Sequence, residues 1–434
     1  MKASGIEWIG DIPEHWEVKV LKRLLDEPLK YGANEAAEFE NKNHPRYIRI
    51  TDFGYDGLLK KDTFKSLSPD IAEPFLLEEG DILFARSGAT VGKTFQFKKY
   101  DGKACFAGYL IKAHPKSYLM TSDYLYYFTK SSAYDIWKES IFTQSTIQNI
   151  GADKYAYLPI SIPNVNIQKQ IADFLDEATS KIDEAIKTKK AQLQSLEKLK
   201  KSIIHKAVTK GLDDEVSMKD SGIEWIGDIP KHWKIERLKD IVEINNNSLL
   251  SNTEKDFLLK YIEISNVNNQ GIISKDNIKE LTFEDAPSRA KRIICEGDTI
   301  VSSVRPNLQA LAYINSNETN LICSTGFFTN RVIYNKKHDK KFVYYFLLSE
   351  FSRQSFISFG KGVGYPSVSD IDYCNLKVLC PKYVEQEKIV EYLEIETEKI
   401  NTLKENVSKQ VSKLEEYKKS LIYEYVTGKK QIKG

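Results

Sequence analysis

The chain has 434 residues, of which 41% are hydrophobic, and this is enough apolar material for two buried cores with accessory helices. Its 63 basic and 61 acidic side chains leave a formal net charge of +2. This balance excludes a global basic field of the kind that drives non-specific nucleic-acid binding, so any nucleic-acid-binding surface must be local.

The five cysteines form no Cys-x-x-Cys pair and no pattern that repeats along the chain. A disulfide framework or a zinc ribbon is therefore not expected, and a reduced cytoplasm is the natural compartment. The N-terminus has no apolar signal region, and no apolar run approaches the roughly 18 residues needed to cross a bilayer. We therefore expect a cytoplasmic protein that does not contact a membrane.

Ten residues near the N-terminus return unchanged in the middle of the chain. Residues 4–13 read Ser-Gly-Ile-Glu-Trp-Ile-Gly-Asp-Ile-Pro, and residues 221–230 have the same sequence. A His-Trp pair follows each copy, at 15–16 and at 232–233. The distance between the copies is too large for a short structural repeat, so it predicts the tandem duplication of a domain-sized unit.

The first half contains short, mixed elements. Residues 47–51 alternate in hydrophobicity, which predicts a half-buried strand. A Glu-Gly-Asp turn at 79–81 introduces a buried strand at 82–85, and residues 123–137 predict one aromatic-rich helix. The prolines of residues 158–163 indicate an edge strand.

Two long helices are the strongest predicted elements. Apolar residues recur at steps of three and four from Ile167 to Ala207, with a break at Lys189. Lysines gather near the end of this stretch, and Gly211 stops it. The same spacing returns after Pro381 and runs to Leu421. An apolar stripe of this length must be buried.

We expect the two helices to bury their stripes against each other as an antiparallel pair. The alternative is that each helix lies along its own domain. The residues predicted to form the helix-pairing seam are Ile171, Phe174, Ile182, Leu193, Leu196, Ile203, Ile389, Leu393, Ile400, Leu403, Val407, Leu414 and Leu421.

The second half repeats the plan of the first. Residues 261–266 match 47–52, and a second Glu-Gly-Asp turn stands at 296–298. The predicted fold is mixed α/β (α+β), with an internal pseudo-two-fold repeat of two globular domains joined by two long antiparallel coiled-coil helices. Its predicted segments are a first domain with the repeated motif at 1–163, a first spacer helix at 164–211, a second domain at 212–381, and a second spacer helix with a tail at 382–434.

Two pairs of polar loops differ between the otherwise similar halves. Residues 86–94 correspond to 302–309, and residues 142–149 correspond to 360–368, with little shared sequence. A preserved framework with divergent polar loops is what two readers of two different targets would have.

Four features together resemble a known family. They are the repeated Gly-Ile-Glu-Trp-Ile-Gly-Asp-Ile-Pro-x-His-Trp motif, the Glu-Gly-Asp turns, the helix starts Gln-Lys-Gln-Ile (168–171) and Gln-Glu-Lys-Ile (386–389), and the Val-Thr helix ends (208–209 and 426–427). In this order they resemble the specificity (S) subunit of type I restriction-modification systems. The resemblance covers nearly the whole chain.

The resemblance implies a DNA-recognition and scaffold role. Each of two target-recognition domains would read one half of a split, asymmetric site in double-stranded DNA. The helices would set the gap between the half-sites and dock two methyltransferase (M) subunits, which methylate adenine, and two restriction (R) subunits can join. The S subunit itself is implied to be non-catalytic and to hold no cofactor or metal, since S-adenosylmethionine, ATP and Mg belong to the partner subunits.

Polar loop residues are the candidates for DNA binding, because Arg pairs with guanine, Gln and Asn pair with adenine, and Lys, Ser and Thr contact phosphates or base edges. The candidates in the first half are Arg86, Ser87, Thr90, Lys93, Gln144, Ser145, Thr146 and Gln148. Those in the second half are Arg305, Asn307, Gln309, Ser324, Thr325, Lys361 and Tyr365.

Other functions remain as alternatives. Residues 87–94 resemble a P-loop, but the first position is Ser where the phosphate cradle needs Gly, so a P-loop ATPase is a weaker hypothesis. A coiled-coil interaction protein that does not bind DNA, such as an antirestriction decoy, is a third. His15 and His232 lack metal-ligand spacing, and we interpret both as structural neighbours of the adjacent indoles.

Overall fold

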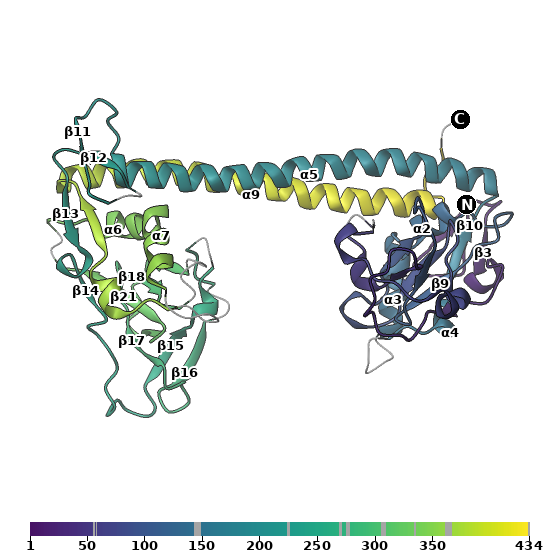
Figure 1. The fold of residues 1–434 in the computed structure, drawn as a ribbon, viewed down its shortest axis with the longest axis horizontal. Coiled ribbons are helices and arrows are strands. Elements are labelled where there is room, and N and C mark those ends of the chain that lie inside the picture. Colours follow the sequence, from purple (N-terminus) through teal and green to yellow (C-terminus); the bar gives the residue numbers. More distant parts are fainter. Residues whose placement is uncertain are drawn as a thin grey trace. The chain divides into compact units, whose positions relative to one another are not determined.

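The computed structural model describes residues 1–54, 57, 59–142, 149–223, 226–268, 271–274, 278–304, 310–333, 336–360 and 367–432. These residues form two compact units (Figure 1). Unit 1 consists of Met1–Lys190 and Ser408–Gly434, and unit 2 consists of Ala191–Val407. Each half of the sequence therefore contributes to the unit of the other half through its long helix.

The long helices are α5 (Val165–Lys210) and α9 (Tyr383–Val426). Both fall within the ranges predicted for the spacer helices. No described helix is long and apolar enough to pass through a lipid bilayer.

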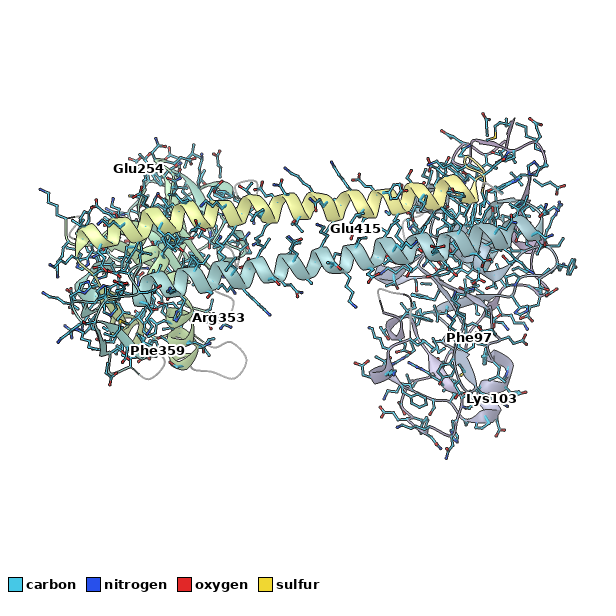
Figure 2. The ribbon with its side chains drawn as sticks, turned by 90° about the horizontal axis from the view of Figure 1, so that it is seen from above. Phe97, Lys103, Glu254, Arg353, Phe359 and Glu415 are labelled. Atoms are coloured by element: carbon cyan, nitrogen blue, oxygen red, sulfur yellow. The ribbon has the colours of Figure 1, made fainter. Side chains whose placement is uncertain are left out.

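The two helices run antiparallel in each unit. In unit 1, Lys418 binds the carboxylate of Asp183 at 2.7 Å, and Lys190 binds Glu415, which is labelled in Figure 2, at 3.1 Å. The residue number rises on one helix as it falls on the other. In unit 2, Lys404 pairs with Glu197 and the Lys200 ammonium donates to Asn401 at 3.0 Å, with the same direction.

The predicted seam residues differ in burial. Buried members are Ile171, Ile182, Ile389, Leu393, Ile400, Val407 and Leu421. Partly buried members are Phe174, Leu193, Leu196, Ile203 and Leu414. Buried helix residues that the prediction missed include Leu175, Ile186, Ile204 and Ile422.

Leu403 does not belong to the seam, because 50% of its surface is exposed. At this level of unit 2 the neighbouring Lys404 and Asn401 face α5 and bind Glu197 and Lys200. These contacts between the helices are polar, so the heptad spacing assigns Leu403 to the seam although its neighbours make the contacts.

Unit 1 is built on short strands. Its four-stranded sheet has the order β4 (Lys30–Tyr31), β9 (Leu110–Ala113), β6 (Ile82–Ala85), β7 (Thr94–Gln96), and all neighbours are antiparallel. Two further pairs are β5 (Arg46–Ile48) with β8 (Ala104–Phe106), and β3 (Glu17–Val20) with β10 (Pro159–Ile162). The predicted buried strand at 82–85 and the strand at 158–163 are both present.

The strand predicted at 47–51 is wrong in its extent and exposure. Strand β5 is buried on both faces and ends at Ile48. The chain then makes a 3-10 turn over Ile50–Asp52, in which the buried Asp52 carboxylate accepts from the Arg49 backbone N–H at 2.7 Å. This side chain satisfies the backbone that a longer strand would have paired, so the strand stops. Unit 2 has the same turn at Ile264–Asn266.

The single helix predicted at 123–137 is two helices, α2 (Ser122–Phe128) and α3 (Ser132–Phe142). The Thr129 hydroxyl donates to the Tyr126 carbonyl at 2.7 Å, and the Ser131 hydroxyl donates to the Phe128 carbonyl at 2.7 Å. Ser131 also accepts from the backbone N–H of Tyr134. Both hydroxyl groups therefore compete with the helical hydrogen bonds and break the helix.

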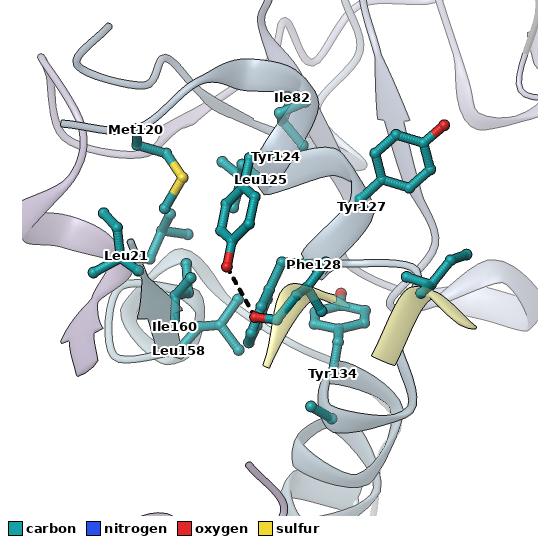
Figure 3. Packing of buried hydrophobic residues seen from close by; sticks show 14 of the residues in the cluster. Leu21, Ile82, Met120, Tyr124, Leu125, Tyr127, Phe128, Tyr134, Leu158 and Ile160 are labelled. Atoms are coloured by element: carbon teal, nitrogen blue, oxygen red, sulfur yellow. Dashed lines mark hydrogen bonds between the residues drawn. The ribbon is translucent and has the colours of Figure 1, made fainter. Parts of the chain in front are cut away.

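The core of unit 1 forms where α2 packs on the sheet and on β10. Figure 3 shows Tyr124, Leu125 and Phe128 of α2 beside Ile82 of β6 and Ile160 of β10, all fully buried. The Tyr124 hydroxyl donates to the backbone carbonyl of Val426 at 2.8 Å. The C-terminal end of α9 is therefore part of this core.

Unit 2 repeats the plan with longer strands. One four-stranded sheet has the order β14 (Val242–Ile244), β21 (Phe327–Val332), β18 (Thr299–Ser302), β19 (Leu311–Tyr313), and the other has the order β16 (Lys279–Thr282), β15 (Leu258–Ile262), β20 (Leu321–Ser324), β17 (Ala290–Ile293). Strand β13 (Lys234–Arg237) pairs with β22 (Lys377–Cys380). The helices are α6 (Lys340–Leu348), α7 (Glu350–Phe359) and α8 (Asp370–Cys374).

Each copy of the repeated motif contacts the end of one long helix. In unit 1, the Lys429 ammonium donates to the backbone carbonyl of Asp11, just beyond the end of α9. In unit 2, the Lys210 ammonium at the end of α5 donates to the carbonyl of Ile226 at 3.1 Å. The motif therefore fastens each unit to the long helix that belongs to the other half of the sequence.

Both His-Trp pairs are exposed at the imidazole and buried at the indole. Glu385, in the first turn of α9, binds His232 at 2.8 Å and accepts from the Trp233 indole at 2.9 Å. His232 thus has a structural role beside its tryptophan.

Candidate nucleic-acid interface

The two divergent loops of unit 1 are brought together at the end of β6. The backbone N–H of Arg86 donates to the carbonyl of Tyr109 at 3.0 Å, and the carbonyl of Arg86 accepts from Ile150 at 2.9 Å. Ser87 and Asn149 form an antiparallel bridge. We call these five residues the unit 1 loop junction.

Unit 2 has the same backbone arrangement at the end of β18. The backbone N–H of Ser303 donates to the carbonyl of Gly326 at 2.9 Å, and the carbonyl of Ser303 accepts from the backbone N–H of Val368 at 2.9 Å. Val304 and Ser367 form the matching bridge. These five residues form the unit 2 loop junction. The sequence did not show that the two divergent loops of each half meet, because the meeting depends on backbone hydrogen bonds.

A buried aspartate fixes the strand that leads to each junction. Asp81 accepts from the Glu78 backbone at 2.7 Å and binds His114 at 2.8 Å, and burial raises the pKa of this carboxyl. Asp298 accepts from the Cys295 backbone at 2.8 Å and forms a two-pronged pair with Arg331 at 2.7 and 2.9 Å. Hydrogen bonding to Asp298 raises the pKa of Arg331.

The structure describes four of the first-half candidates. Arg86 and Ser87 lie in the unit 1 junction and are partly buried. Thr90 ends the 3-10 turn Gly88–Thr90, and Lys93 is exposed just before β7. The hairpin that joins β6 to β7 therefore carries all four.

The structure describes two of the second-half candidates, and they differ. Thr325 is exposed between β20 and β21. Ser324 is only 3% exposed, and its hydroxyl accepts from the backbone N–H of Gly326 at 3.2 Å. The Ser324 hydroxyl therefore takes part in the turn between β20 and β21.

The other candidates lie outside the described residues: Gln144, Ser145, Thr146, Gln148, Arg305, Asn307, Gln309, Lys361 and Tyr365.

Sequence reasoning missed two tyrosines at the unit 1 junction, Tyr109 within it and Tyr31 beside it. Tyr31 is 42% exposed at the end of β4, and its ring centroid lies 5.0 Å from the guanidinium carbon of Arg86. Its hydroxyl accepts from the backbone N–H of Ala152 at 2.9 Å. Tyr109 is 63% exposed. Neither belongs to a divergent loop pair, so no sequence signal marked them.

Two serine hydroxyl groups at the end of β18 are occupied by hydrogen bonds within unit 2. Ser302 donates to the carbonyl of Val304 at 2.8 Å, and Ser303 donates to the carbonyl of Gly326 at 2.9 Å. The nearby Arg292 binds Asn245 and the carbonyl of Phe327. The two junctions thus have the same backbone hydrogen bonds and different side chains.

The P-loop hypothesis does not fit the geometry. Residues 87–93 connect β6 to the antiparallel strand β7, whereas a P-loop connects a strand to the N-terminus of a helix. Within the described part of the chain, no group of three His, Cys, Asp or Glu residues could hold a metal ion.

The fold and the paired junctions define an internally duplicated α/β protein. Its two units have similar sheets and junction backbones and differ in the junction side chains. The chain belongs to the family described as "Type I restriction modification DNA specificity domain", which matches residues 13–195 and 230–413. The two matched segments correspond to the two halves of the duplication.

Two relatives from Methanocaldococcus jannaschii are similar over nearly their whole length. The type I restriction enzyme MjaVIII specificity subunit is 26% identical over 436 residues, covering 98% of this chain and 95% of the relative. The putative type I restriction enzyme MjaX specificity subunit is 27% identical over 454 residues, covering 98% and 96%.

Solved structures support the fold. A chain from a study described as "Structural basis underlying complex assembly and conformational transition of the type I R-M system" has a TM-score of 0.71 at 14% identity, covering 96% of this chain and 98% of that one. The HsdS subunit from Thermoanaerobacter tengcongensis has a TM-score of 0.50 at 14% identity, with the same coverage. At this identity the likeness concerns the fold alone.

Proposed function

We propose that this chain is the DNA sequence-recognition subunit of a type I restriction-modification complex, in which each unit reads one half of a bipartite, asymmetric DNA site. The observation that carries the proposal is the pair of loop junctions, which have the same backbone hydrogen bonds and different side chains. Family membership and the names of the relatives support it.

The junctions are suited to reading base edges. Each stands at the end of a buried strand that an aspartate anchors, so its loops start from a rigid base. Side chains in this position can enter a groove, where hydrogen-bonding groups distinguish the base pairs. Lys93 and Thr325, which are exposed, would contact phosphates or sugars and fix the register.

Helices α5 and α9 would form the spacer that sets the gap between the half-sites and docks two M subunits. The polar bridges between the helices, such as those of Lys190 with Glu415 and Lys404 with Glu197, hold their register. The chain would confer specificity on adenine methylation and restriction by its M and R partners without catalysing either reaction. S-adenosylmethionine, ATP and Mg would bind in those partners, in the cytoplasm.

A selection from randomised duplex DNA by the chain with its M subunits tests this proposal. The expected result is a split motif with two unlike halves and a fixed gap. Selection of one uninterrupted motif would contradict the division between the units. A complex that forms but retains no DNA in a gel shift would instead support the interaction-protein alternative.

A further inference from the structure

The guanidinium of Arg86 is held against an aromatic ring and is incompletely paired. Its carbon lies 5.0 Å from the centroid of the Tyr31 ring, and its Nε–H is buried with no hydrogen-bond partner. Arginine stays charged at any ordinary pH and offers five N–H donors. Because Nε is enclosed by the unit, a ligand from outside would meet the terminal NH2 groups of the guanidinium, which can donate two hydrogen bonds side by side.

The strand register explains how the two side chains meet. Tyr31 of β4 is paired with Ile111 of β9, and Ile111 is paired with Phe84 of β6, two residues before Arg86. The Tyr31 hydroxyl is also tied to the backbone of Ala152, on the chain that follows Ile150 of the junction. The Tyr31 ring is therefore held in place by the sheet on one side and by the backbone of Ala152 on the other.

We propose that Tyr31 is a positioning residue for Arg86 and that this pair reads one guanine in the half-site bound by unit 1. The inference rests on the proposed function and names a base for it. Stacking on the ring limits the orientations of the planar guanidinium, and a fixed guanidinium can donate two parallel hydrogen bonds to O6 and N7 of guanine.

Unit 2 has no such element among its described residues. The backbone hydrogen bonds make Ser303 the equivalent of Arg86, one residue after the Ser302 with which the sequence match begins. The Ser303 hydroxyl donates to the carbonyl of Gly326 at 2.9 Å. Its nearby arginine, Arg292, is occupied by Asn245 and Phe327. The stacked arginine is therefore a feature of unit 1 that the described residues of unit 2 do not repeat.

The test is a binding selection from randomised duplex DNA, using the full chain in complex with its M subunits. Wild type is expected to select a guanine at one position of one half-site. Arg86→Ala should reduce that preference about 10-fold or more, the size of one bidentate pair, and Tyr31→Leu should reduce it at the same position. Tyr31→Phe, which keeps the ring, should preserve most of it.

Tyr118→Leu is the matched control, because Tyr118 is 69% exposed in the same unit and should leave every position unchanged. Circular dichroism and thermal unfolding confirm that each variant is folded. A loss spread evenly over all positions in Tyr31→Leu, or an unchanged preference, would overturn the inference while the split motif of the wild type upheld the proposed function. A wild type that selects no sequence would overturn both.

Discussion

At the scale of single residues, burial lowers the pKa of Lys130. Its ammonium donates to the carbonyl of Thr94 at 2.7 Å and lies 4.6 Å from the centroid of the Tyr126 ring. Burial, and then the charge of Lys418, lower the pKa of Lys130 to about 8 from an ordinary value of 10.5. The folded protein therefore holds this proton less tightly than the unfolded chain does.

This difference predicts a pH dependence of stability. Between about pH 8 and 10.5 the unfolded chain binds more protons at this position, so the free energy of unfolding should rise with pH across that window. We expect the melting temperature of wild type to gain on that of Lys130→Met as the pH rises from 8 to 10. Calorimetry on both proteins measures the difference, and a constant difference across the window would refute the assignment.

Single residues also show how far the sequence determines the site. Arg86 is predictable as an arginine in a divergent loop. Tyr31 is not, since its place beside Arg86 depends on the pairing of β4 with β9 and of β9 with β6. Ser324 has a hydroxyl that could bind DNA, and the structure buries that hydroxyl in a turn. Residue type alone does not show whether a polar side chain is exposed to solvent or buried in the protein.

At the scale of elements, a glutamine joins each long helix to its unit. The Gln168 side chain accepts from the Thr121 backbone at 2.8 Å and donates to the carbonyls of Leu119 and Pro163. Gln386 makes the same three kinds of contact with Asp339, Lys337 and Pro381. Both side chains are fully buried, so each amide satisfies backbone groups that water cannot reach.

Replacing Gln168 by Ala should therefore destabilise unit 1. It removes three hydrogen bonds and leaves buried backbone groups unpaired, at a cost of about 1–3 kcal/mol for each group left unsatisfied. Thermal unfolding should show a clear loss, whereas Gln170→Ala, at an exposed position two residues further along α5, should change little. Equal effects of the two substitutions would contradict the proposed joint.

The helices also allow a test of the spacer. Inserting seven residues after Lys190 in α5 and seven after Val407 in α9 keeps the heptad pattern and lengthens each helix by about 10 Å at about 1.5 Å per residue. We expect the gap in the selected DNA site to grow by about three base pairs at 3.4 Å each. An intact complex that keeps the original gap would reject the spacer role.

The accuracy of the element predictions followed the length of the periodic pattern. The two long helices could be located because many turns repeat one apolar stripe, and their antiparallel pairing is confirmed. The short strand at 47–51 and the aromatic helix at 123–137 were misjudged, because local hydrogen bonds from Asp52, Thr129 and Ser131 override the pattern. Leu403 fits the heptad spacing and is nevertheless exposed.

At the scale of the whole molecule, each half of the duplicated sequence contributes part of its long helix to the unit of the other half. The motif at residues 4–13 contacts the segment that follows α9, and its copy at 221–230 contacts the end of α5. Each unit therefore contains helix from both halves of the sequence. The repeated motif predicted the duplication, but it did not predict this exchange, since the two copies are identical and either could have packed on its own helix.

We propose that the two structurally similar units read two different half-sites independently of each other. Exchanging residues 23–160 for the corresponding segment of another family member, and mapping methylated adenines in a host that carries the chain with its M subunits, tests it most directly. We predict that one half of the methylated motif changes while the other half and the gap stay the same. A change in both halves, or in neither, would contradict the account.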